Sequence, residues 1–212
     1  MNSPPKLHPG LNLGPAHGDD HEAAENSIFG FWVFMMSDLV TFGMFFALYA
    51  TALHATAGGP GPKDLFDLSS VAWQTGFLLV SSLTSGLALL HVKTHHHRSG
   101  AAIGPMLFWL LATVALGGLF LWREIGDFQA MAAQGALPTR SNWLSSLWAL
   151  VGLHGLHVSI GMLWALVIAL GVLLRGVDQR WKLTLLRWGV FWHFLDIVWI
   201  AIFSFVYLGG LR

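Results

Sequence analysis

The stretch from Phe31 to Ala50, "FWVFMMSDLVTFGMFFALYA", is almost entirely apolar and aromatic, and Asp38 is its one charged residue. A membrane-spanning helix needs about 20 mainly apolar residues, so this stretch is long enough to cross a bilayer. No basic residue lies near Asp38 in the sequence. Ionisable groups in membrane helices usually face the bundle interior and pair with another group. The stretch therefore predicts a membrane helix and raises the question of what Asp38 contacts.

The composition of the whole chain is typical of a membrane protein. Of its 212 residues, 55% are apolar and only 10% are charged, whereas soluble domains carry about 25% charged residues. A formal net charge of zero argues against nucleic-acid binding, which requires a basic surface. The absence of Cys excludes disulfides, thiolate metal sites, iron–sulfur clusters and covalently attached c-type haem.

Five apolar runs are long enough to span a bilayer, and short connections containing Gly, Pro or charged residues separate them. The expected fold is all-α: a bundle of five transmembrane helices over residues 28–212, preceded by a disordered polar arm over residues 1–27. Because this arm has no apolar core of signal-peptide length, we expect the first helix to be retained. The expected spans are residues 28–53, 71–92, 101–122, 143–174 and 184–208.

The distribution of basic residues predicts the orientation of these helices. Seven of the eleven Lys and Arg residues lie on the side that holds the N-terminal arm and the second and fourth connections. Because Lys and Arg are enriched in cytoplasmic loops, the N-terminus is expected in the cytoplasm and the C-terminus in the periplasm.

Besides Asp38, two pairs of polar residues lie deep in the predicted spans. His154 and His157 belong to "VGLHGLHVSIG", and His193 and Asp196 belong to "FWHFLDIVWI". Residues three apart share a helix face, and both pairs are expected near mid-membrane, where they could meet. Four interpretations remain open: a structural polar network with Asp38 protonated or bonded to backbone, a proton path, haem or metal ligation by the histidines, and a transporter substrate site.

Two further carboxyl groups and a run of histidines lie at the ends of the spans. Glu124 and Asp127 occur in "LWREIGDF", beside Arg123, and are expected to form an exposed interfacial ion-pair cluster. The histidines at 95–97 lie in the connection before the third span and are expected to be solvated. Any metal ion bound by these histidines would be adventitious.

Four stretches taken together resemble subunit III of the haem–copper respiratory oxidases. They are "FGFWVFMMSDLVTFGMFFALYA", "WREIGDF", "GLHGLHVSIG" and "FWHFLDIVWIAIFSFVYL", in that order along the chain. Asp38 follows Ser37 where many members of the family have Glu, and Asp127 also stands where Glu is usual. Five spans rather than seven, with "TAGGPGPKDLFDL" after the first, are similar to the branch of the bacterial bo-type ubiquinol oxidases.

This resemblance implies a non-catalytic subunit of a proton-pumping terminal oxidase of aerobic respiration in the bacterial inner membrane. It implies subunit I as the main partner and subunits II and IV as further partners. Haem and copper are then expected in the catalytic subunit, with no catalytic residue, cofactor or metal in this chain. The implied roles are to stabilise the oxidase, to support proton uptake and to hold phospholipid in a cleft between the first helices and the others. The candidates for lipid contact are Trp32, Ser37, Phe42, Phe45 and Phe46.

Two alternatives remain. Subunit III of a cytochrome c oxidase would resemble the same stretches, because other subunits select the electron donor. The second alternative is an independent small transporter or b-haem protein. Against it, the chain shows no repeat typical of inverted-repeat transporters and no Glu-x-x-His motif typical of di-metal carboxylate sites.

Overall fold

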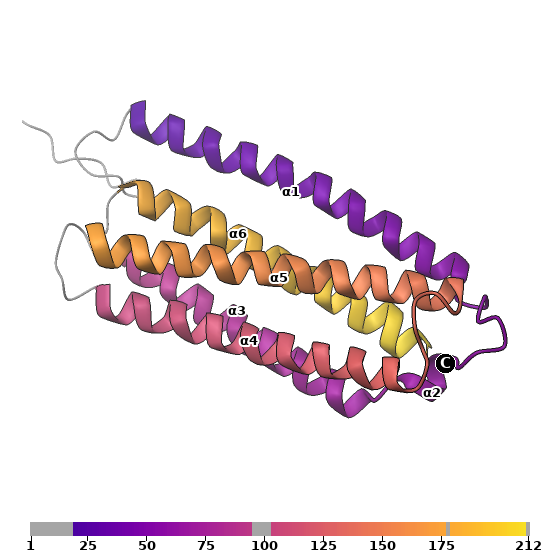
Figure 1. Cartoon of the computed structure of the whole chain (residues 1–212). Helices are drawn as coiled ribbons and strands as arrows, with labels where there is room; N and C mark the ends of the chain where they lie inside the picture. Colours follow the sequence, from indigo (N-terminus) through magenta and orange to yellow (C-terminus); the bar gives the residue numbers. More distant parts are fainter. Residues whose placement is uncertain (1–18, 95–102, 177–178, 211–212) are drawn as a thin grey trace, which may run out of the picture.

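The computed structural model describes residues 19–94, 103–176 and 179–210, which form a bundle of long helices (Figure 1). The described residues contain no strand, and five of their helices are long and apolar enough to cross a membrane. The expected all-α fold with five spans is therefore confirmed. In chain order the elements are α1 (Asp19–Ala52), α2 (Pro62–Leu65), α3 (Leu68–Thr94), α4 (Ile103–Ala133), α5 (Asn142–Arg175), α6 (Gln179–Ile202) and the π-helix η2 (Phe203–Leu208).

The helix boundaries shift from the expected ones, and two shift most, the start of α1 and the end of α4. Helix α1 begins at Asp19, so residues 19–27 are helical and do not belong to a disordered arm; residues 1–18 lie outside the described part. Helix α4 continues to Ala133, well beyond the expected end at residue 122. The extension packs on α5, where Phe128 stacks on Trp148 with ring centroids 4.3 Å apart. Packing against α5 thus keeps the polar "WREIGDF" stretch helical.

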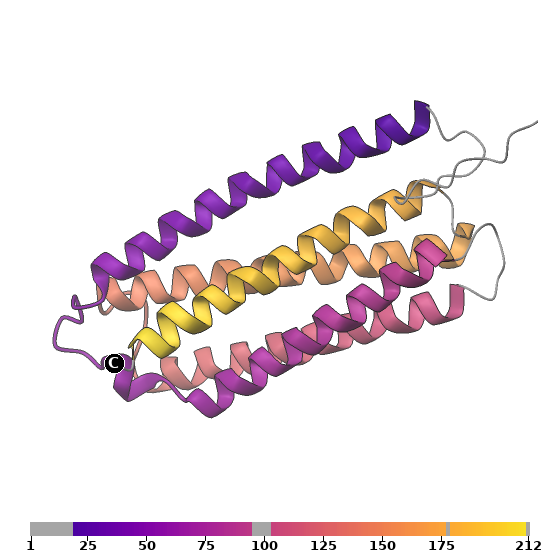
Figure 2. The same ribbon diagram turned by 180° about the vertical axis from the view of Figure 1, so that it is seen from behind.

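The helices pack in a definite order. Helix α3 packs on α4 and α6, and α5 packs on α4 and α6, whereas α1 packs on α5 and α6. Seen from behind, α6 lies between α1 and α3 (Figure 2). The second span, α3, therefore packs with α4 and α6 rather than with α1. The expected cleft, with the first helices on one side and the other helices on the other, is wrong in placing α3 beside α1. Helix α1 lies at the edge of the bundle, where it packs on α5 and α6.

Short polar side chains and glycine define several helix ends. Before α3, the Asp67 carboxylate accepts hydrogen bonds from the backbone N–H and the hydroxyl of Ser69, at 2.9 and 2.8 Å. These bonds stabilise the charged form and hold the pKa of Asp67 below its ordinary value. Ser141 caps α5 in the same way, accepting from the N–H of Leu144 at 3.2 Å. Gly176 follows the last residue of α5, and its φ of 78° suits glycine.

Candidate functional site: polar groups between the membrane helices

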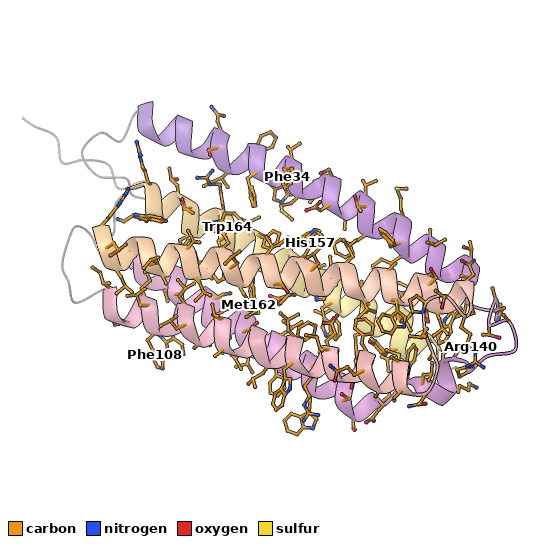
Figure 3. The ribbon with its side chains drawn as sticks, viewed as in Figure 1. Phe34, Phe108, Arg140, His157, Met162 and Trp164 are labelled. Carbon is orange, nitrogen blue, oxygen red and sulfur yellow. The ribbon has the colours of Figure 1, made fainter. Side chains whose placement is uncertain are left out.

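Asp38 has its partner on α5. Its Oδ2 lies 3.8 Å from Nε2 of His157, and Nδ1 of the same ring lies 2.8 Å from the carbonyl oxygen of Leu153. A carbonyl oxygen can only accept, so Nδ1 carries a proton and the neutral ring leaves Nε2 as an acceptor. Figure 3 shows His157 on the side of α5 that faces α1.

Phe42 of α1 packs against both histidines of α5. Its ring centroid lies 5.3 Å from that of His157 and 6.5 Å from that of His154. Because Phe42 is only 1% exposed, it cannot reach a lipid, and its predicted lipid contact is wrong. The other four candidates are exposed or half-buried, and lipid contact stays a prediction for them: Trp32, Ser37, Phe45 and Phe46.

His154 is enclosed by aromatic rings. It is fully buried, stacks on Trp199 with centroids 5.2 Å apart, and meets Phe120 edge-to-face at 5.7 Å. Neither of its ring nitrogens has a hydrogen-bond partner among the residues that the structure describes. His154 therefore joins α4, α5 and α6 by ring packing.

Glu124 is buried against α5. It is 5% exposed, and a Cβ placed on Gly155 would lie 2.8 Å from its Oε1. Gly155 is thus the residue that lets the carboxyl approach the α5 backbone. Oε2 of Glu124 has no hydrogen-bond partner within the described ranges. The expected exposed ion-pair cluster is therefore wrong for Glu124, because α5 covers this face of α4.

Asp127 faces α3. Its Oδ2 accepts from the hydroxyl of Ser70 at 2.9 Å and from the amide of Gln74 at 2.7 Å. Both donors are buried, whereas Arg123 is exposed. Asp127 is half-buried and serves as a hydrogen-bonded link between α3 and α4, and Arg123 interacts electrostatically with its carboxyl group.

Helix α3 carries further polar side chains that bond to its neighbours. Sequence reasoning missed these links, although Thr75 and the polar run "VSSLTSG" in an apolar span were signals for them, since polar groups in membrane helices bond across to other helices. Three such bonds connect α3 to α4 and α6: Thr84–Thr113 at 2.7 Å, Trp192–Ser81 at 3.1 Å and Trp199–Thr75 at 3.0 Å.

His193 and Asp196 of α6 lie toward α3. Nδ1 of His193 is 3.0 Å from the hydroxyl oxygen of Ser82 and 3.5 Å from Oδ2 of Asp196. Both carboxyl oxygens of Asp196 are buried without a hydrogen bond in the part of the chain that is described. His154, by contrast, packs against rings of α1, α4 and α6, and His157 faces α1. Among the described residues the two pairs, which could have met at mid-membrane, make no direct contact.

The described residues offer no group of three His, Asp or Glu side chains that could hold a metal ion. The histidines at 95–97 lie outside the described residues. What the polar groups can do is join helices, as Asp38 and His157 do between α1 and α5.

Comparison with known proteins identifies the family, although no family model matches the chain. The chain is 46% identical over 198 residues to the cytochrome bo(3) ubiquinol oxidase subunit 3 of Pseudomonas aeruginosa, covering 93% of this chain and 92% of that protein. It is 39% identical over 190 residues to the protein of the same name from Pseudomonas putida, covering 90% and 89%. A probable quinol oxidase subunit 3 of Staphylococcus epidermidis is 37% identical over 194 residues, covering 90% and 92%. Because these identities extend over nearly the whole chain, it belongs to the quinol oxidase subunit 3 family within subunit III of the haem–copper respiratory oxidases.

Proposed function

We propose that this chain is the non-catalytic subunit III of a bacterial, proton-pumping ubiquinol oxidase in the inner membrane. The observation that carries the proposal is the 46% identity to a ubiquinol oxidase subunit 3 over 93% of the chain. The names of the relatives favour quinol over cytochrome c as the electron donor of the complex. A subunit 3 works within a multi-subunit complex, and we assign subunit I as the main partner, with subunits II and IV beside it.

We place haem and copper in the catalytic subunit and give the membrane histidines of this chain structural roles. His154 packs against aromatic rings of α4 and α6, His157 faces Asp38 of α1, and His193 faces Ser82 of α3. Each of these histidines thus makes contacts between helices, which favours a structural role.

The proposed role in the complex is to stabilise the catalytic subunit and to hold phospholipid. Helix α1 packs on α5 and α6 and leaves large apolar side chains exposed, such as Trp32 at 49% and Phe34 at 58%. Acyl chains are a suitable cover for such a surface. Support of proton uptake is then indirect: the subunit keeps the proton entrance of subunit I in its working form, with the N-terminus in the cytoplasm.

Co-purification tests this function. An affinity-tagged chain is isolated from native membranes in mild detergent, and the visible spectrum and subunit content of the product are measured. We expect a large haem-bearing subunit and oxygen consumption with a ubiquinol analogue but not with reduced cytochrome c. A chain that purifies alone and carries its own b-haem spectrum would contradict the proposal.

A further inference from the structure

The outer side of α6 carries a polar side chain at mid-membrane depth, and only part of its hydrogen-bonding capacity is used within the bundle. His193 lies near the centre of the span Arg180–Leu208, and its side chain is 42% exposed. Nδ1 is engaged by Ser82, whereas Nε2 has no partner among the described residues. Ionisable residues at this depth normally pair with a polar group or line a water-filled space. The imidazole therefore needs a partner from outside the bundle.

Further exposed residues surround His193. Ile197 and Ile200 are 64% and 47% exposed, and their spacing places them on the same side of α6 as His193. On the neighbouring α3, Gly86 has open space where a Cβ would stand. Figure 2 shows α3 and α6 together on the near side of the molecule. We define the α3–α6 face as Leu79, Ser82 and Gly86 of α3 with His193, Ile197 and Ile200 of α6.

The exposed side of α5 has a different character. In the view of Figure 1, α5 lies on the near side of the bundle and α3 lies behind α4. Its exposed residues are mainly aliphatic, with Leu163 at 63% and Leu170 at 57%. The hydroxyl of Ser159 is satisfied within the helix, donating to the carbonyl of Gly155 at 2.8 Å. Such a side suits acyl chains, whereas the α3–α6 face presents an unmatched hydrogen-bonding group.

We propose that the α3–α6 face is the docking surface for a membrane helix of the haem-bearing partner subunit. This helix places a hydrogen-bonding side chain against Nε2 of His193. The inference rests on the proposed function, which supplies the partner. A lipid cannot take this place, because acyl chains form no hydrogen bonds and headgroups lie about 15 Å from mid-membrane. Small residues such as Ser82 and Gly86 also allow a neighbouring helix to approach closely.

Site-specific photocrosslinking in the intact oxidase tests this docking surface. The photoreactive residue p-benzoylphenylalanine replaces Ile197 or Ile200, and replaces Leu163 or Leu170 on α5 as matched controls. After illumination in native membranes, we expect adducts with the haem-bearing subunit, identified by mass spectrometry, from the two α6 positions only. Adducts with lipid alone at the α6 positions, or adducts with that subunit from the α5 positions only, would overturn the inference.

Substitution of His193 gives a second measurement that needs no bulky probe. His193→Leu should lower the amount of subunit retained on the haem-bearing subunit in a stronger detergent by roughly three- to tenfold, as expected for one membrane hydrogen bond. His193→Gln keeps a hydrogen-bonding group and should retain most of the complex. Ser159→Ala removes a hydroxyl of α5 that bonds only within its own helix, so a loss as large as that of His193→Leu would overturn the inference. Co-purification of the unchanged chain in mild detergent reports separately on the proposed function.

Discussion

At the scale of single residues, Asp38 is linked to α5 through His157. Since Leu153 commits Nδ1 of His157 to donating, only Nε2 can face the acid. The two side chains face each other between the helices, and this contact is sufficient to join α1 to α5.

We therefore predict that Asp38→Asn assembles and keeps most of the proton pumping, because its amide can donate to Nε2 of His157. Asp38→Leu removes the link and should weaken the complex and shorten its working lifetime during turnover. Ser37→Ala is the control, since the hydroxyl of Ser37 bonds only to its own helix. The measurement is the number of protons moved per electron in reconstituted vesicles. Normal oxygen consumption without pumping in Asp38→Asn would show a proton relay and refute the structural role.

Gly155 permits a second residue-scale feature, the approach of Glu124 to α5. In Gly155→Ala the new Cβ would lie 2.8 Å from the carboxyl oxygen, and overpacking of this kind costs about 1–3 kcal/mol. We expect a lower thermal midpoint for the purified complex. Gly152→Ala is the matched control, because a Cβ there meets nothing within 4 Å. Equal midpoints for the two variants would show that α4 and α5 do not pack as described.

At this scale the sequence showed which polar residues lie in the membrane but not what they contact. Asp38, the histidine pairs and Asp196 are visible as interruptions of apolar runs. Their partners depend on how each helix is rotated about its axis, which hydropathy does not determine. Hence Phe42 was expected at lipid and Glu124 at an exposed interface, although neighbouring helices cover both.

At the scale of elements, tertiary packing sets the ends of helices where local sequence does not. The charged stretch after residue 122 was expected to end the third span, but α4 continues because Phe128 and Met131 bury against neighbouring residues. The start of α3 is different, since Asp67 is a local signal for a helix N-terminus. Such capping bonds were recognisable from sequence, whereas long-range packing was not.

Asp67 gives a pH-dependent prediction. Its pKa is lowered in the folded chain relative to the ordinary value of 3.8, because Ser69 donates hydrogen bonds to the carboxylate. A lowered pKa means that the bonds stabilise the fold above that ordinary value and lose their effect as the pH falls through the folded pKa. The thermal midpoint of Asp67→Ala should therefore lie below that of the unchanged chain at pH 6, and the gap should shrink below pH 3.8. A gap that does not depend on pH would contradict the capping role.

At the scale of the whole molecule, the helices differ in how much the bundle covers them. In the apolar window of the first span, 11% of residues are buried, compared with 50% for the last. Helix α3 is tied to α4 and α6 by side-chain hydrogen bonds. Helix α1 relies on its contacts with α5 and α6, such as Phe31 against Trp164. The five spans could be predicted from hydropathy, but this unequal coverage required knowledge of which helices pack together.

Because the bundle covers α1 less than the other spans, the stability of its helical structure should depend most on what surrounds the bundle. We predict that removing phospholipid from the purified complex raises hydrogen exchange in the Trp32–Phe46 segment of α1 before it does so in α3 and α4. The α3–α4 pair is the internal control, since the hydrogen bonds between these helices are independent of lipid. Adding phospholipid back should restore protection of α1. Protection lost equally from all helices, or α1 unaffected by complete delipidation, would contradict a lipid cover on α1 and point to a protein partner on that side.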